Sequence, residues 1–201
     1  MLIELKPIIL IGHSKQFSNK SLFEKKLTKI LSHLEDYEVI AVGDEQNLIK
    51  NVFDTKVVNT IPYRAKTTII NKILEQSTYV VMFWDGTDID EFVYRSLLYH
   101  KKSRIIPVET TKVVNKDKGE PFDVYIGRGT PWGNPFAIGV EGMTREDVIA
   151  KYEEYFKEKI LGDEVRRKEI LSLKGKILGC HCKPLACHGD VIASYINSLD
   201  I

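Results

Sequence analysis

The sequence predicts an α/β protein built in two parts: a parallel sheet with flanking helices, followed by a small α/β (α+β) domain that carries a Cys/His motif. Three observations lead to this prediction. Strand-like and helix-like patterns alternate through the first half, a polar and turn-rich stretch follows them, and all three cysteines lie close together near the end. We therefore expect one domain over residues 1–112 and a second over residues 120–201.

The first half contains five segments whose apolar runs are typical of buried strands. They are residues 7–12, 37–43, 56–59, 79–84 and 104–108. Between them, apolar residues spaced three and four apart predict helices over residues 18–34, 65–76 and 90–101. Strands that alternate with helices form parallel, Rossmann-like sheets with right-handed crossovers. Ligands bind such sheets at the carboxyl ends of the strands, so we expect a site just after the first and fourth strands.

The second half has a different composition. Residues 115–121 (NKDKGEP) are polar and rich in turn formers, which is typical of a linker or a hairpin tip, so we expect the domain boundary there. The remaining predicted elements are a short strand over 123–127, a Gly/Pro-rich loop, helices from Thr144 and from Asp163, a strand over 176–180 and a last helix to Leu199.

The amino-acid composition disfavours several classes of function. The 29 basic and 28 acidic residues give no global positive charge for nucleic acid or an anionic membrane. No apolar run reaches the ~20 residues of a membrane span, and the apolar start, Met1 to Ile11, predicts a first strand because it lacks the flanks of a signal peptide. An odd number of clustered cysteines disfavours a disulfide framework. We therefore expect a cytoplasmic protein.

A first candidate ligand site lies where the first and fourth strands end. A glycine after a buried strand lets backbone amides approach a phosphate, and the amino terminus of the next helix favours an anion. The alternative is that the glycine only permits a tight turn. Arg64 either binds a phosphate through its forked guanidinium or is a solvated residue at a helix start. The strand-end residues expected to bind a ligand are Gly12, His13, Ser14, Asp85, Gly86 and Thr87.

Residues 6–109 resemble the SLOG superfamily, a Rossmann-like group. The resemblance rests on the Gly-x-Ser turn after the first strand, the Arg64 segment and the strand end at residues 83–87. It implies a nucleotide or nucleotide-derived ligand, and some members hydrolyse the N-glycosidic bond of a nucleoside monophosphate. Of the hydrolase loop Gly-Gly-x-Gly-Thr-x-x-Glu, only Gly86, Thr87 and Glu91 have counterparts here. Homodimers are common in the superfamily, so the resemblance also implies a homodimer.

A second candidate site begins with the loop GRGTPWGNPF, residues 127–136. Its three glycines and two prolines fix an irregular backbone. Arg128 offers a bidentate anion partner, Trp132 a stacking face, and Asn134 a paired donor and acceptor. That set suits a base or a phosphate. In the alternative interpretation, Trp132 and Phe136 fill the core.

The segment CHCKPLACH, residues 180–188, places five metal-binding side chains in nine residues. Cys180, Cys182, Cys187 and His188 are a chemically reasonable ligand set for zinc, although their spacing differs from that of familiar zinc fingers. Two alternatives stay open. Cys187 at a helix start would have a lowered pKa and act as a nucleophile beside His188, or the cysteines are small core residues.

Residues 123–197 closely resemble DUF4326, a bacterial and phage domain of unknown function. The matching motifs are YIGR at 125–128, WGNPF at 132–136, TRE at 144–146, Tyr152, LKGK at 173–176 and C-x-C-x-P-x-x-CHGD at 180–190. The resemblance brings no established activity. It implies that six residues converge on one pocket: Arg128, Asn134, Cys182, Cys187, His188 and Asp190.

Three functions follow from these sites. The preferred one is binding of a nucleotide or nucleotide-derived small molecule in a sensing or sequestering role. The second is a hydrolase or transferase acting at an N-glycosidic bond of a nucleotide. Its catalytic residues would be Glu91 or Asp85, or the cluster of Cys187, His188 and Asp190. The third, a nucleic-acid accessory protein, is disfavoured by the balanced charge. Turnover separates the first two, because a sensor leaves its ligand intact.

Overall fold

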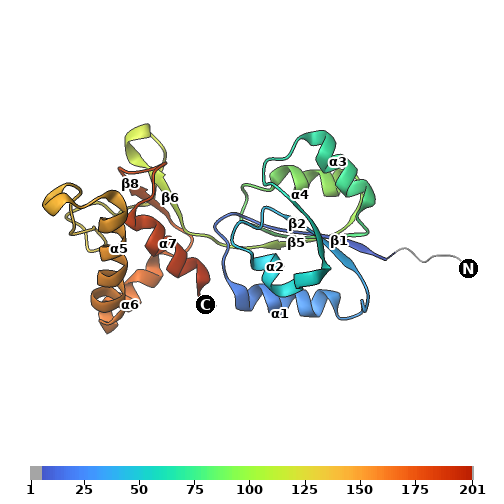
Figure 1. The fold of residues 1–201 in the computed structure, drawn as a ribbon, viewed down its shortest axis with the longest axis horizontal. Coiled ribbons are helices and arrows are strands. Elements are labelled where there is room, and N and C mark those ends of the chain that lie inside the picture. The colour runs from blue at the N-terminus through green and yellow to red at the C-terminus, as the bar shows by residue number, and fades with distance from the viewer. Residues whose placement is uncertain (1–5, 201) are drawn as a thin grey trace, which may run out of the picture. The chain divides into compact units, whose positions relative to one another are not determined.

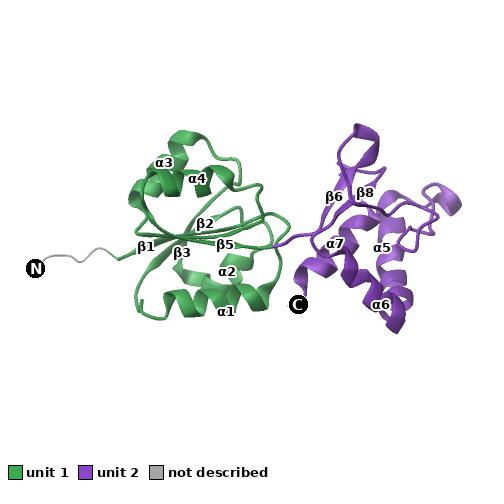
Figure 2. Ribbon diagram, turned by 180° about the vertical axis from the view of Figure 1, so that it is seen from behind, with its two compact units in different colours: residues 1–108, 200 green, residues 109–199, 201 purple. Residues whose placement is uncertain are grey.

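The computed structural model describes residues 6–200 and divides into two compact units, residues 1–108 and residues 109–199 (Figure 2). The part of the predicted first strand over residues 1–5 lies outside the described residues. The boundary falls slightly before the predicted residue 112. The expected linker after it belongs to unit 2, because residues 112–115 form a strand that pairs within that unit.

Unit 1 is a parallel sheet covered by helices on both faces (Figure 1). Its strands are β1 (Ile8–His13), β2 (Glu38–Val42), β3 (Val57–Ile61), β4 (Tyr79–Trp84) and β5 (Lys102–Pro107). Its helices are α1 (Lys20–Leu31), α2 (Leu48–Phe53), α3 (Thr67–Gln76) and α4 (Asp90–Leu98). Helices α1 and α2 cover one face, and α3 and α4 cover the other. The predicted α/β class and parallel sheet are therefore confirmed, and only α2 was not predicted.

The strand order β3-β2-β1-β4-β5 determines where the loops of unit 1 meet. The chain runs outward from β1 through β2 to β3, and then returns to the other side of β1 with β4. This reversal is the topological switch point of such a sheet. Because β1 and β4 pair in parallel, with His13 opposite Phe83, the loops that follow these two strands lie side by side.

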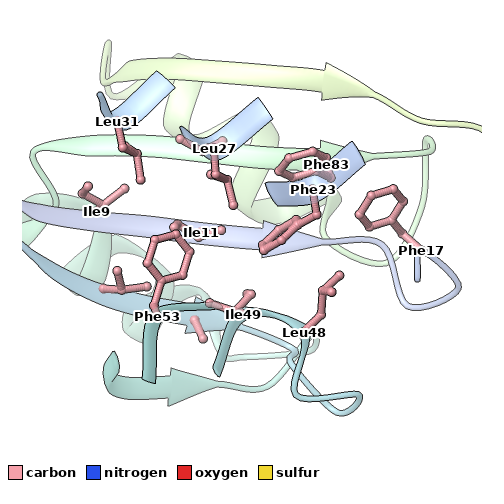
Figure 3. Close-up of a cluster of buried hydrophobic side chains, with 13 residues drawn as sticks. Ile9, Ile11, Phe17, Phe23, Leu27, Leu31, Leu48, Ile49, Phe53 and Phe83 are labelled. Atoms are coloured by element: carbon pink, nitrogen blue, oxygen red, sulfur yellow. The ribbon is translucent and has the colours of Figure 1, made fainter. Parts of the chain in front are cut away.

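The core of unit 1 consists of two layers separated by the sheet. Successive residues of β1 face opposite sides, so that Ile9 and Ile11 pack in one cluster while Leu10 packs in the other. In the first cluster, shown in Figure 3, the ring of Phe23 on α1 lies 4.9 Å from that of Phe83 on β4. These contacts hold α1 on the strand that ends at the candidate ligand loop.

Unit 2 has a smaller parallel sheet and three main helices. Its strands are β6 (Lys112–Asn115), β7 (Val124–Tyr125) and β8 (Ile177–Cys180), in the order β6-β8-β7. Its helices are α5 (Arg145–Tyr155), which continues as a π-helical segment over Phe156–Leu161, α6 (Glu164–Ile170) and α7 (His188–Ser198). Among residues 6–200, no helix combines the length and the apolar character that a membrane span requires.

We predict that Phe23→Ala destabilises unit 1 by about 3–5 kcal/mol, because it removes a fully buried ring from the interface of α1 and β4. The measurement is denaturant unfolding of the full chain. Lys26→Ala, on the exposed face of the same helix, is the matched control and should change stability by less than about 0.5 kcal/mol. Equal effects of the two substitutions would contradict the packing described here.

Candidate functional site

The loops after β1 and β4 are joined by hydrogen bonds at the switch point of unit 1. The Ser14 hydroxyl accepts from the backbone N–H of Asp85 at 3.0 Å and donates to the carbonyl of Thr87 at 3.3 Å. The Ser14 side chain is fully buried. Its hydroxyl therefore bridges the two loops, and a contact of Ser14 with a ligand stays a prediction.

His13 is also fully buried, contrary to the expectation that it binds a ligand. Its Nε2 lies 3.4 Å from Oδ1 of Asp44, which follows β2. Burial acts to raise the pKa of Asp44. The contact with His13 and the backbone N–H groups of Ile49 and Lys50, each at 2.8 Å, outweigh it and lower that pKa. His13 thus anchors the loop that leads into α2.

Gly12 serves the packing of the sheet. A Cβ at Gly12 would lie 2.7 Å from the Met82 sulfur and 3.0 Å from Cβ of Val42. Gly12 therefore lets neighbouring strands pack closely, in agreement with the alternative that its role is geometric. Gly86, by contrast, has a φ of +91° with open space around it, and Asp85 accepts from the Thr87 hydroxyl at 2.7 Å beside it.

The two remaining candidates of unit 1 lie on its surface. Arg64 is exposed and forms no side-chain hydrogen bond or ion pair with the described residues. Glu91 accepts from Nε of Arg95 at 2.7 Å, one turn further along α4, and Arg95 also donates to Asn71 at 3.2 Å. Glu91 is therefore engaged in a surface ion pair, and its catalytic role stays a prediction.

Unit 2 contains a pocket of about 350 Å³, which we call the unit 2 pocket. It lies where β7 and β8 end and α7 begins. Of the six residues expected to converge, it brings together Arg128, Asn134, Cys182, Cys187 and His188. Its other lining residues are Tyr125, Gly127, Phe136, Ile138, Arg145, Val148, Ile149, Cys180, His181 and Ala186.

Asp190 does not line the unit 2 pocket. Its carboxylate accepts from the backbone N–H of Cys187 at 2.9 Å and pairs with the Lys183 ammonium. It therefore closes the first turn of α7, where an acidic side chain is stabilised by the helix dipole. Its oxygens thus serve the helix start, and the expected catalytic role of Asp190 stays a prediction.

Arg128 and Arg145 supply the positive charge of the unit 2 pocket. Arg128 donates from Nη2 to the carbonyl of Phe136 at 3.1 Å, and Arg145 donates from Nη1 to the carbonyl of Ala186 at 3.3 Å. Each guanidinium keeps further N–H donors beyond these bonds. No Asp or Glu lines the pocket within the part of the chain that the structure describes.

Two residues of the loop 127–136 are structural. Trp132 is buried in the core of unit 2, where its carbonyl accepts from the Tyr152 hydroxyl at 2.7 Å. Its predicted role as a stacking face for a ligand is therefore wrong, and the core-filling alternative holds. Asn134 donates to the carbonyl of Val148 at 3.0 Å and accepts from the N–H of Phe136 at 2.9 Å, so its amide shapes the pocket wall.

Cys180 and Cys187 are a buried thiol pair with their sulfurs 3.6 Å apart. The Cys187 thiol donates to Cys180, and together with the backbone N–H groups of Lys183 and Cys182 it lowers the pKa of Cys180 to about 6. The same contact and burial raise the pKa of Cys187. The prediction of a lowered pKa at Cys187 is therefore wrong, because the helix start at Cys187 faces a second, more readily ionised thiol.

His188 is hydrogen-bonded to the main chain, and its role as a base toward Cys187 stays a prediction. Its Nε2 donates to the carbonyl of Ile126 at 2.7 Å, and burial lowers its pKa, so the ring is neutral at pH 7. In residues 6–200, no three His, Cys, Asp or Glu side chains are grouped to hold a metal ion. Zinc bound by Cys180, Cys182, Cys187 and His188 thus stays a prediction, without a coordination geometry to support it.

Tyr125, His181 and Asp117 form a chain of side chains that the sequence did not predict. The Tyr125 hydroxyl lies 2.8 Å from Nε2 of His181, and Nδ1 of His181 lies 2.6 Å from Oδ2 of Asp117. Hydrogen bonds from His181 and then Lys116 lower the pKa of Asp117. The YIGR and CHC motifs contain Tyr125 and His181, but Asp117 lies in the stretch taken for a linker.

Comparison with known proteins agrees with this division. The minimal SLOG domain matches residues 6–114, more than half of the chain, and the domain of unknown function DUF4326 matches residues 110–198. The uncharacterized 12.4 kDa protein in the nrdA-td intergenic region of Enterobacteria phage T4 is 43% identical over 88 residues, which cover 44% of this chain and 79% of that protein. No solved structure matches the chain.

The two matches differ in what they say about function. The SLOG domain indicates a nucleotide-related function in general, whereas DUF4326 has no known function. The T4 relative, which is itself uncharacterized, adds no activity. With its Rossmann-like sheet and these matches, the chain belongs to the minimal SLOG domain family through residues 6–114 and carries a DUF4326 domain in residues 110–198.

Proposed function

We propose that the chain binds an anionic, nucleotide-derived small molecule in the unit 2 pocket, in a sensing or sequestering role. The observation that carries this proposal is the charge of the pocket. Arg128 and Arg145 line it, and no carboxylate of the described residues does. The chain as a whole has nearly equal numbers of basic and acidic residues, so the excess of positive charge at this pocket is local.

The geometry of the two arginines supports recognition of a phosphate. Each guanidinium is held by one hydrogen bond to a backbone carbonyl, those of Phe136 and Ala186. Such anchoring reduces the side-chain entropy lost on binding, while the remaining N–H donors suit bidentate contacts to phosphate oxygens. The first residues of α7, an eleven-residue helix, also line this pocket through Cys187 and His188.

The other walls support a partly apolar ligand. The ring of Phe136 and the aliphatic side chains of Ile138, Val148 and Ile149 line the pocket, and such surfaces pack against a base or a sugar. A volume of about 350 Å³ lies at the small end of the roughly 300–1,000 Å³ of ligand pockets. The proposal is therefore a ligand the size of a mononucleotide, in keeping with the nucleotide-related function of the SLOG family.

A second candidate site is the switch point of unit 1. It is favoured by the backbone of Gly86, which has a positive φ and no neighbouring atoms over its Cα. Such a position lets a ligand approach the main chain closely. Arg64 is an exposed cation of the same unit. Nucleotide binding at this edge would agree with the usual site of Rossmann-like sheets.

We expect Arg128→Ala and Arg145→Ala each to weaken ligand binding by roughly 10- to 100-fold, because each removes a charge-assisted contact of about 1.5–3 kcal/mol. The purified protein is first incubated with nucleoside mono-, di- and triphosphates, NAD, ADP-ribose and cyclic dinucleotides. Mass spectrometry scores retained molecules and new products. The affinity of the retained molecule is then measured for each variant.

Arg167→Ala is the matched control, because it removes the same charge from an exposed position on α6 and should leave the affinity unchanged. Arg64→Ala tests the unit 1 candidate in the same assay. A loss of affinity in Arg64→Ala, with full affinity in Arg128→Ala and Arg145→Ala, would assign binding to unit 1. Failure of the wild-type protein to retain any molecule of the panel would contradict both sites.

A further inference from the structure

Tyr125, His181 and Asp117 form a continuous hydrogen-bonded chain at the wall of the unit 2 pocket. We call these three side chains the relay. Tyr125 and His181 both line the pocket. The Tyr125 hydroxyl lies 2.8 Å from Nε2 of His181, and the opposite nitrogen, Nδ1, lies 2.6 Å from Oδ2 of Asp117. The ligand proposed above requires no member of the relay.

The donor and acceptor roles of the three groups determine the direction of the hydrogen bonds in the relay. An ionised carboxylate only accepts hydrogen bonds, so Nδ1 of His181 carries the proton that Asp117 accepts. In the neutral imidazole Nε2 is then unprotonated and accepts the hydrogen bond from the Tyr125 hydroxyl. The Tyr125 proton therefore points at a base, and that base is held in one tautomer by a carboxylate. This is the arrangement by which an imidazole activates a hydroxyl group.

A buried side chain holds the backbone of two members of the relay, Asp117 and His181, in place. Asn115, at the end of β6, accepts from the backbone N–H of Asp117 at 2.8 Å and donates to the carbonyl of His181 at 3.3 Å. Asn115 is 7% exposed. Because one amide fixes the backbone of both residues, the relay is pre-organised by the scaffold, as a catalytic group needs to be.

Two further contacts surround the Tyr125 side chain at the wall of the unit 2 pocket. The Lys116 ammonium lies 5.7 Å from the centre of the Tyr125 ring and 2.9 Å from Oδ1 of Asp117. A Cβ at Gly127, a residue of the pocket wall, would lie 1.9 Å from the Tyr125 oxygen. The hydroxyl therefore occupies the space over Gly127 that any other side chain would take.

We propose that Tyr125 is the acid–base residue of a hydrolytic site in the unit 2 pocket, with His181 as its proton acceptor and Asp117 as a positioning residue. The substrate class is a phosphorylated, nucleotide-derived molecule. In this respect the inference rests on the binding part of the proposed function, and it replaces the sensing or sequestering role with turnover. A bound water gives one proton to the Tyr125 oxygen while the Tyr125 proton passes to Nε2 of His181. The hydroxide forms an O–P bond to the substrate's phosphate, the bond from phosphorus to the leaving-group oxygen breaks, and that oxygen takes the proton back through Tyr125 as His181 returns to its neutral form.

The first experiment measures the reactivity of Tyr125 without any substrate. Benzenesulfonyl fluoride reacts with an activated tyrosine: the S–F bond breaks, an O–S bond forms, fluoride leaves and the phenol proton passes to His181. We expect Tyr125 to be labelled about tenfold or more faster than Tyr94, because an adjacent base assists the proton transfer. Tyr94 on α4 is 61% exposed and serves as an internal reference, with peptide mass spectrometry as the readout.

Variants of the relay distinguish activation of Tyr125 by His181 from a general disturbance of the local structure. His181→Ala should reduce labelling at Tyr125 to the rate of Tyr94, and added imidazole should restore it, which a structural defect would not allow. Asp117→Asn should lower the rate, and Tyr125→Phe should abolish the label at this position. Labelling of Tyr125 at the rate of Tyr94 in the wild type, or an unchanged rate in His181→Ala, would overturn the relay.

The second experiment measures turnover with the nucleotide panel. Tyr125→Phe should lower product formation by about 10²- to 10⁴-fold while the retained molecule binds within about threefold of its wild-type affinity. Binding without products in the wild type would overturn the catalytic role and leave the proposed function intact. Fast labelling of Tyr125 that no bound nucleotide slows would support the relay and contradict nucleotide binding in this pocket.

Discussion

The position of β8 between β6 and β7 is the constraint on which unit 2 depends. Its register places Asn115 opposite Cys180 on one side and Tyr125 opposite Gly179 on the other. Because all three strands are parallel, the residues that follow them meet at one edge of the sheet. A slip of one residue would turn each side chain of β8 to the opposite face and would separate His181 from its two partners.

The fold could be predicted from the sequence where apolar patterns are long, as at β1 and β4. Helix α2 and strand β6 could not, because six and four residues are too short to show a period, and β6 runs into a polar stretch. The resemblance to DUF4326 motifs predicted that Arg128 and Cys182 lie in the pocket. The contact of Asp117 with His181 could not be predicted, because it joins residues 64 positions apart through a sheet whose register no local spacing encodes.

The two units use polar residues at strand ends in different ways. In unit 1, His13 and Ser14 are buried, and their polar atoms face partners within the loops, as buried polar groups require. In the sequence such residues resemble ligand contacts. In unit 2, Arg128 and Arg145 use one donor each for the scaffold and keep others for solvent or a ligand. A polar residue type therefore indicates a binding role only when its hydrogen-bonding capacity exceeds what the fold uses.

The absence of a side chain at Gly127 leaves room for the side chain of Tyr125. Since the Tyr125 oxygen fills the space where a Cβ would stand, position 127 cannot acquire a side chain while the tyrosine keeps this arrangement. In a related protein with a smaller residue in place of Tyr125, position 127 can carry a side chain. Where Tyr125 is kept, a side chain at position 127 would displace its phenol ring. A side chain at position 127 should therefore occur only together with a smaller residue at position 125.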